Sequence, residues 1–202
     1  MPTALQRIDA VFRLVDREIW VVTAATADRR GGLTATWVTQ ASIDATRPLA
    51  LIGLAPNHYT AEIVDDSGAF ALHLLTSEQT DLAWGFANGS GRDRDKFSGL
   101  STRYGTTGSP LIEPCLAWLE CKVFARLATA DRNYYWADVV DGNVLTQAGS
   151  VDKRPLTENR FIQQVSDEQR SQLLASRQLD ISVQQPLMEA WRRELPDLIQ
   201  WS

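Results

Sequence analysis

GGLTATWVTQASIDATRPLALIGL, residues 31–54, and the APNHYTAEIV that follows it as residues 55–64 form the most informative stretch of the chain. The first segment predicts two buried strands, 33–42 and 48–54, because β-branched and apolar residues dominate both. Asn57 is a preferred N-cap residue, so a helix is expected from Asn57 to about Asp65.

The first of these strands carries many hydroxyl groups around a central Trp37. Buried hydroxyls need partners, either within the protein or on a polar ligand. The helix start that follows offers free backbone N–H groups, which suit a phosphate. Together these features suggest a phosphorylated, planar cofactor. The simpler interpretation is that threonine is a good strand former and that Asn57 only caps its helix.

The bulk composition is that of a single folded domain. The chain has 202 residues, of which 44% are hydrophobic and 22% are charged. A net charge of −5 argues against a nucleic-acid-binding surface. No segment is apolar for long enough to cross a membrane or to act as a secretory signal, so a cytoplasmic protein is expected. Two cysteines, Cys115 and Cys121, and two histidines make a disulfide or a zinc site improbable.

Strands are expected in the middle of the chain and helices at its ends. Strict alternation predicts a strand over 117–127, with Cys121 facing the core and 133–140 as its hairpin partner. The polar stretch 88–110 is expected to be a long loop. Thr3 with Gln6 and Ser166 with Gln169 resemble capping boxes at two helix starts. The pattern predicts an α+β domain with a closed or split barrel, and no second domain.

The order of these segments resembles the flavin reductase family, which uses the FMN-binding split barrel. The resemblance covers about residues 15 to 157. It is carried by GLTATWVTQASID, RPLALIGLAPNHYTAEIV, SGAFALHLL, DRDKFSGL, GSPLIEPCLAWLECKV and ADRNYYWADVVDG. It implies a mainly antiparallel split β-barrel over 1–156, with flanking helices. Residues 157–202 are then a helical C-terminal extension of the same domain.

The resemblance also implies which residues bind the cofactor. They come from the hydroxyl-rich strand, the helix start and the charged loop, and they are Thr34, Thr36, Trp37, Val38, Thr39, Ser42, Asn57, Tyr59, Thr60, Lys96 and Phe97. Relatives often carry a histidine on the nicotinamide side of the site. This chain has Arg132 there, beside Asn133, so Arg132 either pairs with a phosphate of the pyridine nucleotide or lies in a solvent-facing turn.

No residue spacing indicates a protein nucleophile or an acid–base set, which suits chemistry carried by a cofactor. His73 lies in an apolar strand and is expected to be a core residue with satisfied hydrogen bonds. The resemblance implies an NAD(P)H-dependent flavin reductase that holds FMN, or alternatively FAD. It would be a homodimer that passes electrons to free flavin or to a partner redox protein. The alternatives are a flavin-binding electron carrier or sensor without its own NAD(P)H site, and a flavin-free barrel.

Overall fold

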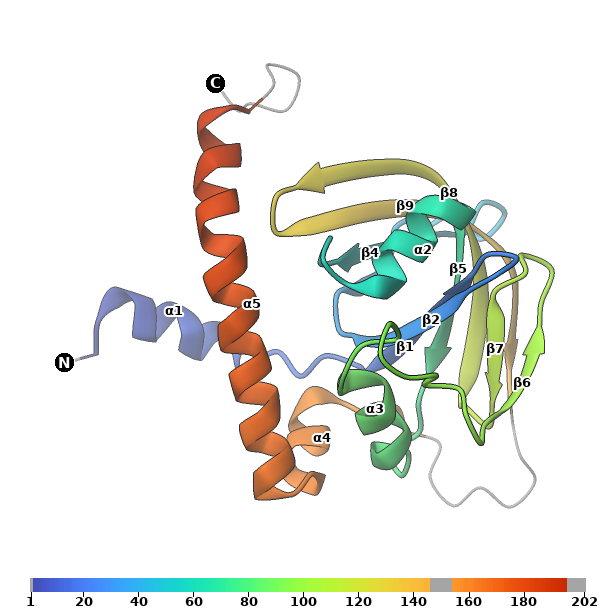
Figure 1. The fold of residues 1–202 in the computed structure, drawn as a ribbon, viewed down its shortest axis with the longest axis horizontal. Coiled ribbons are helices and arrows are strands. Elements are labelled where there is room, and N and C mark those ends of the chain that lie inside the picture. The colour runs from blue at the N-terminus through green and yellow to red at the C-terminus, as the bar shows by residue number, and fades with distance from the viewer. Residues whose placement is uncertain (1, 146–153, 196–202) are drawn as a thin grey trace.

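A seven-stranded antiparallel sheet organises the computed structural model, which describes residues 2–145 and 154–195. The strand order is β2-β1-β5-β8-β9-β4-β3, and a separate small sheet pairs β6 with β7. The sheet curls into a half-barrel (Figure 1), which confirms the predicted split-barrel fold. The strands are β1 (Trp20–Ala25), β2 (Arg30–Ala35), β3 (Val38–Gln40), β4 (Leu49–Leu54), β5 (Ala69–Leu74), β6 (Ser101–Tyr104), β7 (Pro110–Glu113), β8 (Ala117–Thr129) and β9 (Arg132–Val144).

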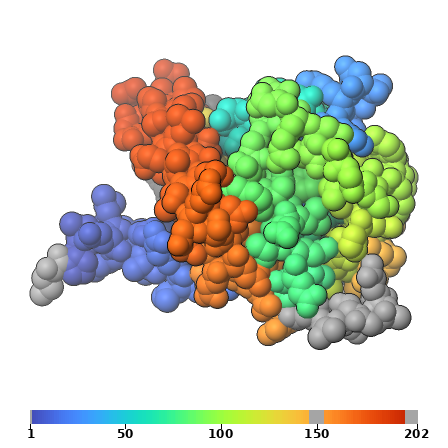
Figure 2. Space-filling model, turned by 60° about the horizontal axis from the view of Figure 1, so that its bottom comes forward, coloured from blue at the N-terminus to red at the C-terminus, as the bar shows by residue number. Residues whose placement is uncertain are grey.

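The helices flank this sheet, and the two at the ends of the chain lie farthest from its centre (Figures 1 and 2). Their bounds are α1 (Ala4–Phe12), α2 (Tyr59–Ser67), α3 (Thr80–Ala87), α4 (Glu158–Gln164) and α5 (Asp167–Arg193). Helix α4 is anchored in the core by Phe161 and by Val165, which follows it. Neither α1 nor α5 has a buried residue.

The single strand predicted over 33–42 is wrong, because the chain breaks at Thr36 and Trp37. Before the break, β2 pairs with β1, and after it, β3 pairs with β4. β2 and β3 are the two edge strands of the sheet, so this short break carries the chain from one edge to the other. The break is held by a hydrogen bond from the Gly53 N–H to the Trp37 carbonyl, at 2.9 Å. Thr36 and Trp37, two of the residues predicted to bind the cofactor, therefore lie where the chain crosses from one edge of the sheet to the other.

The predicted N-cap at Asn57 is also wrong. His58 is the N-cap residue of α2, with an extended backbone and no capping bond from its side chain. The Asn57 amide instead lies 3.5 Å from the Asp180 carboxylate of α5. The sequence rule failed because a tertiary partner competes for the side chain. The capping boxes expected at the starts of α1 and α5 are both present.

The long loop expected over 88–110 is structured in part, since it contains β6 and the first residue of β7. The strand predicted over 117–127 is longer and bears irregularities in its pairing with β9 near Glu120 and Val123. These shift the alternation, so Trp118 and Glu120 are buried as well as Cys121. Both cysteines are free and buried.

His73 is the core histidine that its apolar strand predicted. Its ring is fully buried and lies 3.1 Å, through Nδ1, from the carbonyl of Val21 on β1. Its Nε2 accepts a hydrogen bond from the Ile112 N–H on β7, also at 3.1 Å. The neutral ring therefore ties three strands together. Burial lowers the pKa of His73 to about 4.

The free energy of unfolding is expected to fall as the pH drops from about 6.5 towards 4. The unfolded ring has a pKa near 6.5 and takes up a proton in this range, whereas the folded ring does not. The stabilisation is therefore complete above pH 6.5, and its loss is on the order of 3 kcal/mol. Urea unfolding of the wild type and His73→Gln at several pH values measures it. Equal slopes for the two proteins between pH 6.5 and 4 would contradict this role.

Candidate functional site

A pocket opens on the barrel where β3, β4 and β9 meet the break after β2. Its volume is about 360 Å³, within the range of small-molecule sites. The predicted residues that line it are Thr36, Trp37, Val38 and Thr39. Leu51 and Gly53 of β4, Tyr134 of β9, and Arg17 and Glu18 also line it.

Two parallel aromatic rings form one wall of this pocket. Trp37 and Tyr134 are stacked, with ring centroids 6.4 Å apart and planes 6° from parallel. Gly53 makes room for them, since a Cβ there would lie 3.1 Å from the Tyr134 ring and 3.2 Å from the Trp37 ring. The Arg132 guanidinium lies 4.5 Å from the centre of the Trp37 ring. The wall is thus suited to stack on a flat ring system.

The start of α2 packs against β2. A Cβ on Gly31 would lie 3.2 Å from the Thr60 hydroxyl and 3.3 Å from the Tyr59 ring. Thr60 is itself buried at this contact. A hydroxyl beside a helix start, where backbone N–H groups are free, fits a phosphorylated ligand.

Lys96 and Phe97 lie buried in the loop that follows α3. The Lys96 ammonium is buried and donates a hydrogen bond to the Phe86 carbonyl at 2.8 Å. Burial, together with the nearby Arg94, lowers the pKa of Lys96 to about 8. Phe97 packs edge-on against Phe86, with ring centroids 5.3 Å apart. Lys96 is therefore held in place by the Phe86 carbonyl and remains mostly a cation below pH 8.

Electrostatic effects on His58 show which charges gather at the start of α2. Burial is the main cause that lowers the pKa of His58, and the cations Arg132 and Lys96 lower it further. The Asp180 carboxylate of α5 acts in the opposite direction, and it lies 3.7 Å from Nε2 of His58. Cationic groups from β9 and from the loop after α3 thus converge with a helix N-terminus. This is the environment that an anionic ligand needs.

The structure does not bring all the predicted residues together. Ser42 lines a second pocket, with Asp44 and Phe124. The amide of Asn133 is buried and bonds the Tyr135 hydroxyl at 3.2 Å. Thr34 is three residues beyond Gly31 in β2, so its side chain points to the opposite face of the strand. Thr60 packs on the Gly31 face, and Thr34 therefore lies on the other side of β2 from it.

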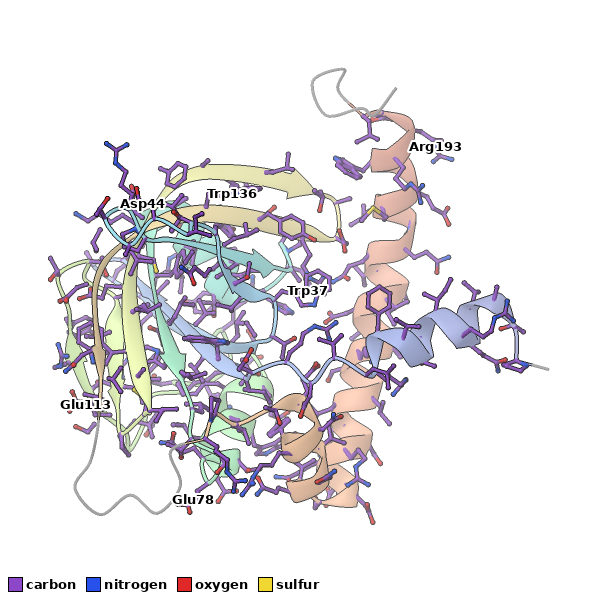
Figure 3. All side chains as sticks on the ribbon, turned by 180° about the vertical axis from the view of Figure 1, so that it is seen from behind. Trp37, Asp44, Glu78, Glu113, Trp136 and Arg193 are labelled. Carbon is purple, nitrogen blue, oxygen red and sulfur yellow. The ribbon has the colours of Figure 1, made fainter. Side chains whose placement is uncertain are left out.

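Sequence reasoning missed the residues that α5 contributes, Asp180 and Gln184. Gln184 accepts a hydrogen bond from Arg132 at 3.0 Å. Trp37 lies on the side of the barrel that faces α5 (Figure 3). Arg132 is therefore no solvent-facing turn residue, since it is held between Trp37 and α5. These two residues lie more than 40 positions beyond the other site residues, and α5 has a polar pattern that carries no motif.

A half-barrel with an aromatic-walled pocket beside a cationic helix start defines a split-barrel protein of the flavin-binding class. Residues 12–157 match the family described as flavin reductase like domain. The chain belongs to this family. The match covers most of the described barrel and ends before α4.

Relatives and solved structures agree with this assignment. The chain is 31% identical over 141 residues to "Putative diflavin flavoprotein A 6" of Nostoc sp., covering 69% of this chain and 24% of that protein. It is similar to the structure of nitrilotriacetate monooxygenase component B from Mycobacterium thermoresistibile, with a TM-score of 0.64, 21% identity and coverage of 75% and 80%. It is also similar to an NADH:FAD oxidoreductase of Streptomyces globisporus, with a TM-score of 0.63, 24% identity and coverage of 72% and 86%. At these identities the structures establish the fold alone.

The chain spans 24% of the diflavin flavoprotein's length. Among the described residues, no group of histidine, cysteine and acidic side chains is arranged to hold a metal ion. The helices described here also include none with the length and apolar character that crossing a bilayer requires.

Proposed function

We propose that this chain binds FMN and catalyses hydride transfer from NAD(P)H to the flavin, which then reduces an acceptor. The observation that carries the proposal is the pocket beside Trp37 and Tyr134, with the cationic start of α2 nearby. The aromatic wall can stack on a flat ring system, and the start of α2 can bind a phosphate. Family membership supports the same conclusion.

Each part of the site then has a role in binding and orientation. The flavin supplies the redox chemistry. In this proposal Trp37 stacks on one face of the ring system, and the hydroxyl and backbone groups of Thr36 and Thr39, which line the same pocket, bond its polar edge. The N–H groups at the start of α2, with the Thr60 hydroxyl, bind the phosphate, and Lys96 neutralises part of its charge. Arg132 would pair with a phosphate of the nucleotide in exchange for its hydrogen bond to Gln184.

Calorimetric titration with FMN, riboflavin and FAD tests the binding step. FMN is expected to bind more tightly than riboflavin, because only FMN brings a phosphate to the helix start. Comparison of FMN with FAD gives the preferred flavin. Failure of all three to bind would contradict the proposal and favour a flavin-free barrel.

The second candidate is a flavin-binding electron carrier or sensor without its own NAD(P)H site. The observation that favours it is Arg132, which is occupied by Trp37 and Gln184 rather than free to meet a nucleotide. A carrier would hold flavin that a redox partner reduces and NAD(P)H does not.

The two cysteines of the chain are buried and free, which suits a reducing compartment, and we place the protein in the cytoplasm.

We propose that the protein works as a homodimer that uses the apolar face of α1. Helix α1 is amphipathic, but its Ile8 and Phe12 are 52% and 61% exposed. Leu14 and Val15 continue the exposed apolar surface towards the barrel. Apolar patches of this kind mark association surfaces. A second copy is the expected partner, with no nucleic acid and no membrane involved.

Ile8→Asp with Phe12→Asp is expected to convert the dimer to a monomer. A carboxylate buried in an apolar interface without a partner is strongly unfavourable. Light scattering coupled to gel filtration measures the mass. Arg7→Asp is the matched control on the same helix and should remain dimeric. A monomeric wild type, or a double variant that stays dimeric, would contradict the proposal.

A further inference from the structure

Helix α5 contacts the proposed ligand site through two side chains. Asp180 approaches Asn57 at 3.5 Å and His58 at 3.7 Å, and both of these lie at the start of α2. Gln184 accepts a hydrogen bond from Arg132 at 3.0 Å. Asp180 and Gln184 are four residues apart, so they lie on the same face of the helix. This face is directed at the two cationic parts of the site.

The Asp180 carboxylate lies in the environment that suits the phosphate of a ligand. It is an anion at the N-terminus of α2, where the helix dipole favours negative charge by about 0.3–1 kcal/mol. Asp180, Arg132 and Lys96 all affect the pKa of His58, so the three charges lie within electrostatic range of the start of α2. A phosphate arriving at the start of α2 would compete with this carboxylate for the same cations.

One buried polar group of α5 has no hydrogen-bond partner among the described residues while the helix lies against the site. Gln184 uses its oxygen to bond Arg132, while its amide nitrogen is buried and has no partner among the described residues. A buried donor without a partner costs about 1–3 kcal/mol. Movement of α5 into solvent would give this amide a partner. With no buried residue of its own, α5 is also held by little apolar contact.

We propose that α5 is a displaceable strap, whose Asp180 carboxylate occupies the anion-binding end of the site until a phosphate-bearing ligand displaces it. This inference rests on the proposed function for the identity of the ligand. The strap makes binding selective for charge. A dianionic phosphate competes with one carboxylate for the start of α2, whereas a flavin without a phosphate does not.

Asp180→Asn tests the strap because it removes the charge and keeps the shape of the side chain. The variant is expected to bind FMN about fivefold more tightly than the wild type and to leave riboflavin affinity unchanged. Glu189→Gln is the matched control, since it removes one charge from an exposed position on the same helix. It should change neither affinity. Weaker FMN binding by Asp180→Asn, or an equal gain in Glu189→Gln, would overturn the proposal.

Inorganic phosphate gives a second measurement that needs no flavin. The imidazole signals of His58 are followed by NMR during a phosphate titration of the full chain. They should respond at lower phosphate concentration in Asp180→Asn than in the wild type. If this difference is present while FMN binds to neither protein, the proposed function fails and the strap is supported. Identical phosphate titrations of the two proteins would overturn the strap.

Discussion

Trp37→Ala is expected to weaken FMN binding by about tenfold to a hundredfold. Stacking of a planar heterocycle on an aromatic side chain contributes about 1–3 kcal/mol. Trp37 is 41% exposed and packs against Tyr134 at the edge of the pocket, so the loss falls on the ligand more than on the core. Fluorescence titration gives the dissociation constant, and thermal unfolding should show a nearly unchanged midpoint.

Phe124→Ala is the control for this substitution. Phe124 is an exposed aromatic residue on β8 that lines the other pocket of the barrel, beside Ser42. Its loss should leave FMN affinity at the wild-type value. If Phe124→Ala lowers the affinity and Trp37→Ala does not, the flavin belongs to the pocket at Ser42, and the assignment of the site is wrong.

Gly32→Ala and Gly85→Ala are expected to change stability in opposite directions. A Cβ on Gly32 would lie 2.5 Å from the Phe86 ring in the core, so the strand or the ring must shift. Overpacking of this kind costs about 1–3 kcal/mol. Gly85 lies within α3, and a Cβ there meets nothing within 4 Å. Alanine at that position should stabilise the helix by about 0.5–1 kcal/mol.

Urea unfolding of the two glycine variants measures both effects against the wild type. The comparison tests whether α3 packs on β2 as closely as the structure describes, which positions Lys96 and Phe97 beside the site. A stabilising Gly32→Ala would contradict this packing. A destabilising Gly85→Ala would contradict the open environment of α3.

Much of the fold is readable from the sequence because its strands are rich in apolar residues and separated by turn residues. The hairpin of β8 and β9 follows from alternation, and the burial of Cys121 and His73 follows from their apolar neighbours. The break at Thr36 is not readable, because β-branched and aromatic residues, which favour strands, continue across it. The break depends on the closure of the barrel, which no local preference encodes.

The candidate site, like the fold, could be predicted from the sequence only in part. The pocket around Trp37 falls within the stretch that the hydroxyl pattern singled out. The contribution of α5 could not be predicted, because Asp180 and Gln184 lie on a polar helix without a motif, far along the chain. The roles of Asn57 and Arg132 also depend on that helix. The spacing of residues within one segment cannot reveal contacts between residues that lie so far apart in the sequence.

The central claim is that this chain holds a flavin which NAD(P)H reduces. The most direct measurement is the visible absorption spectrum of the full chain after loading with FMN and desalting, followed by anaerobic addition of NADH and then NADPH. The account predicts a retained flavin spectrum that one of the two nucleotides bleaches. A retained spectrum that neither nucleotide bleaches would contradict the reductase and support the carrier. No retained flavin, with no turnover of free FMN, would contradict both.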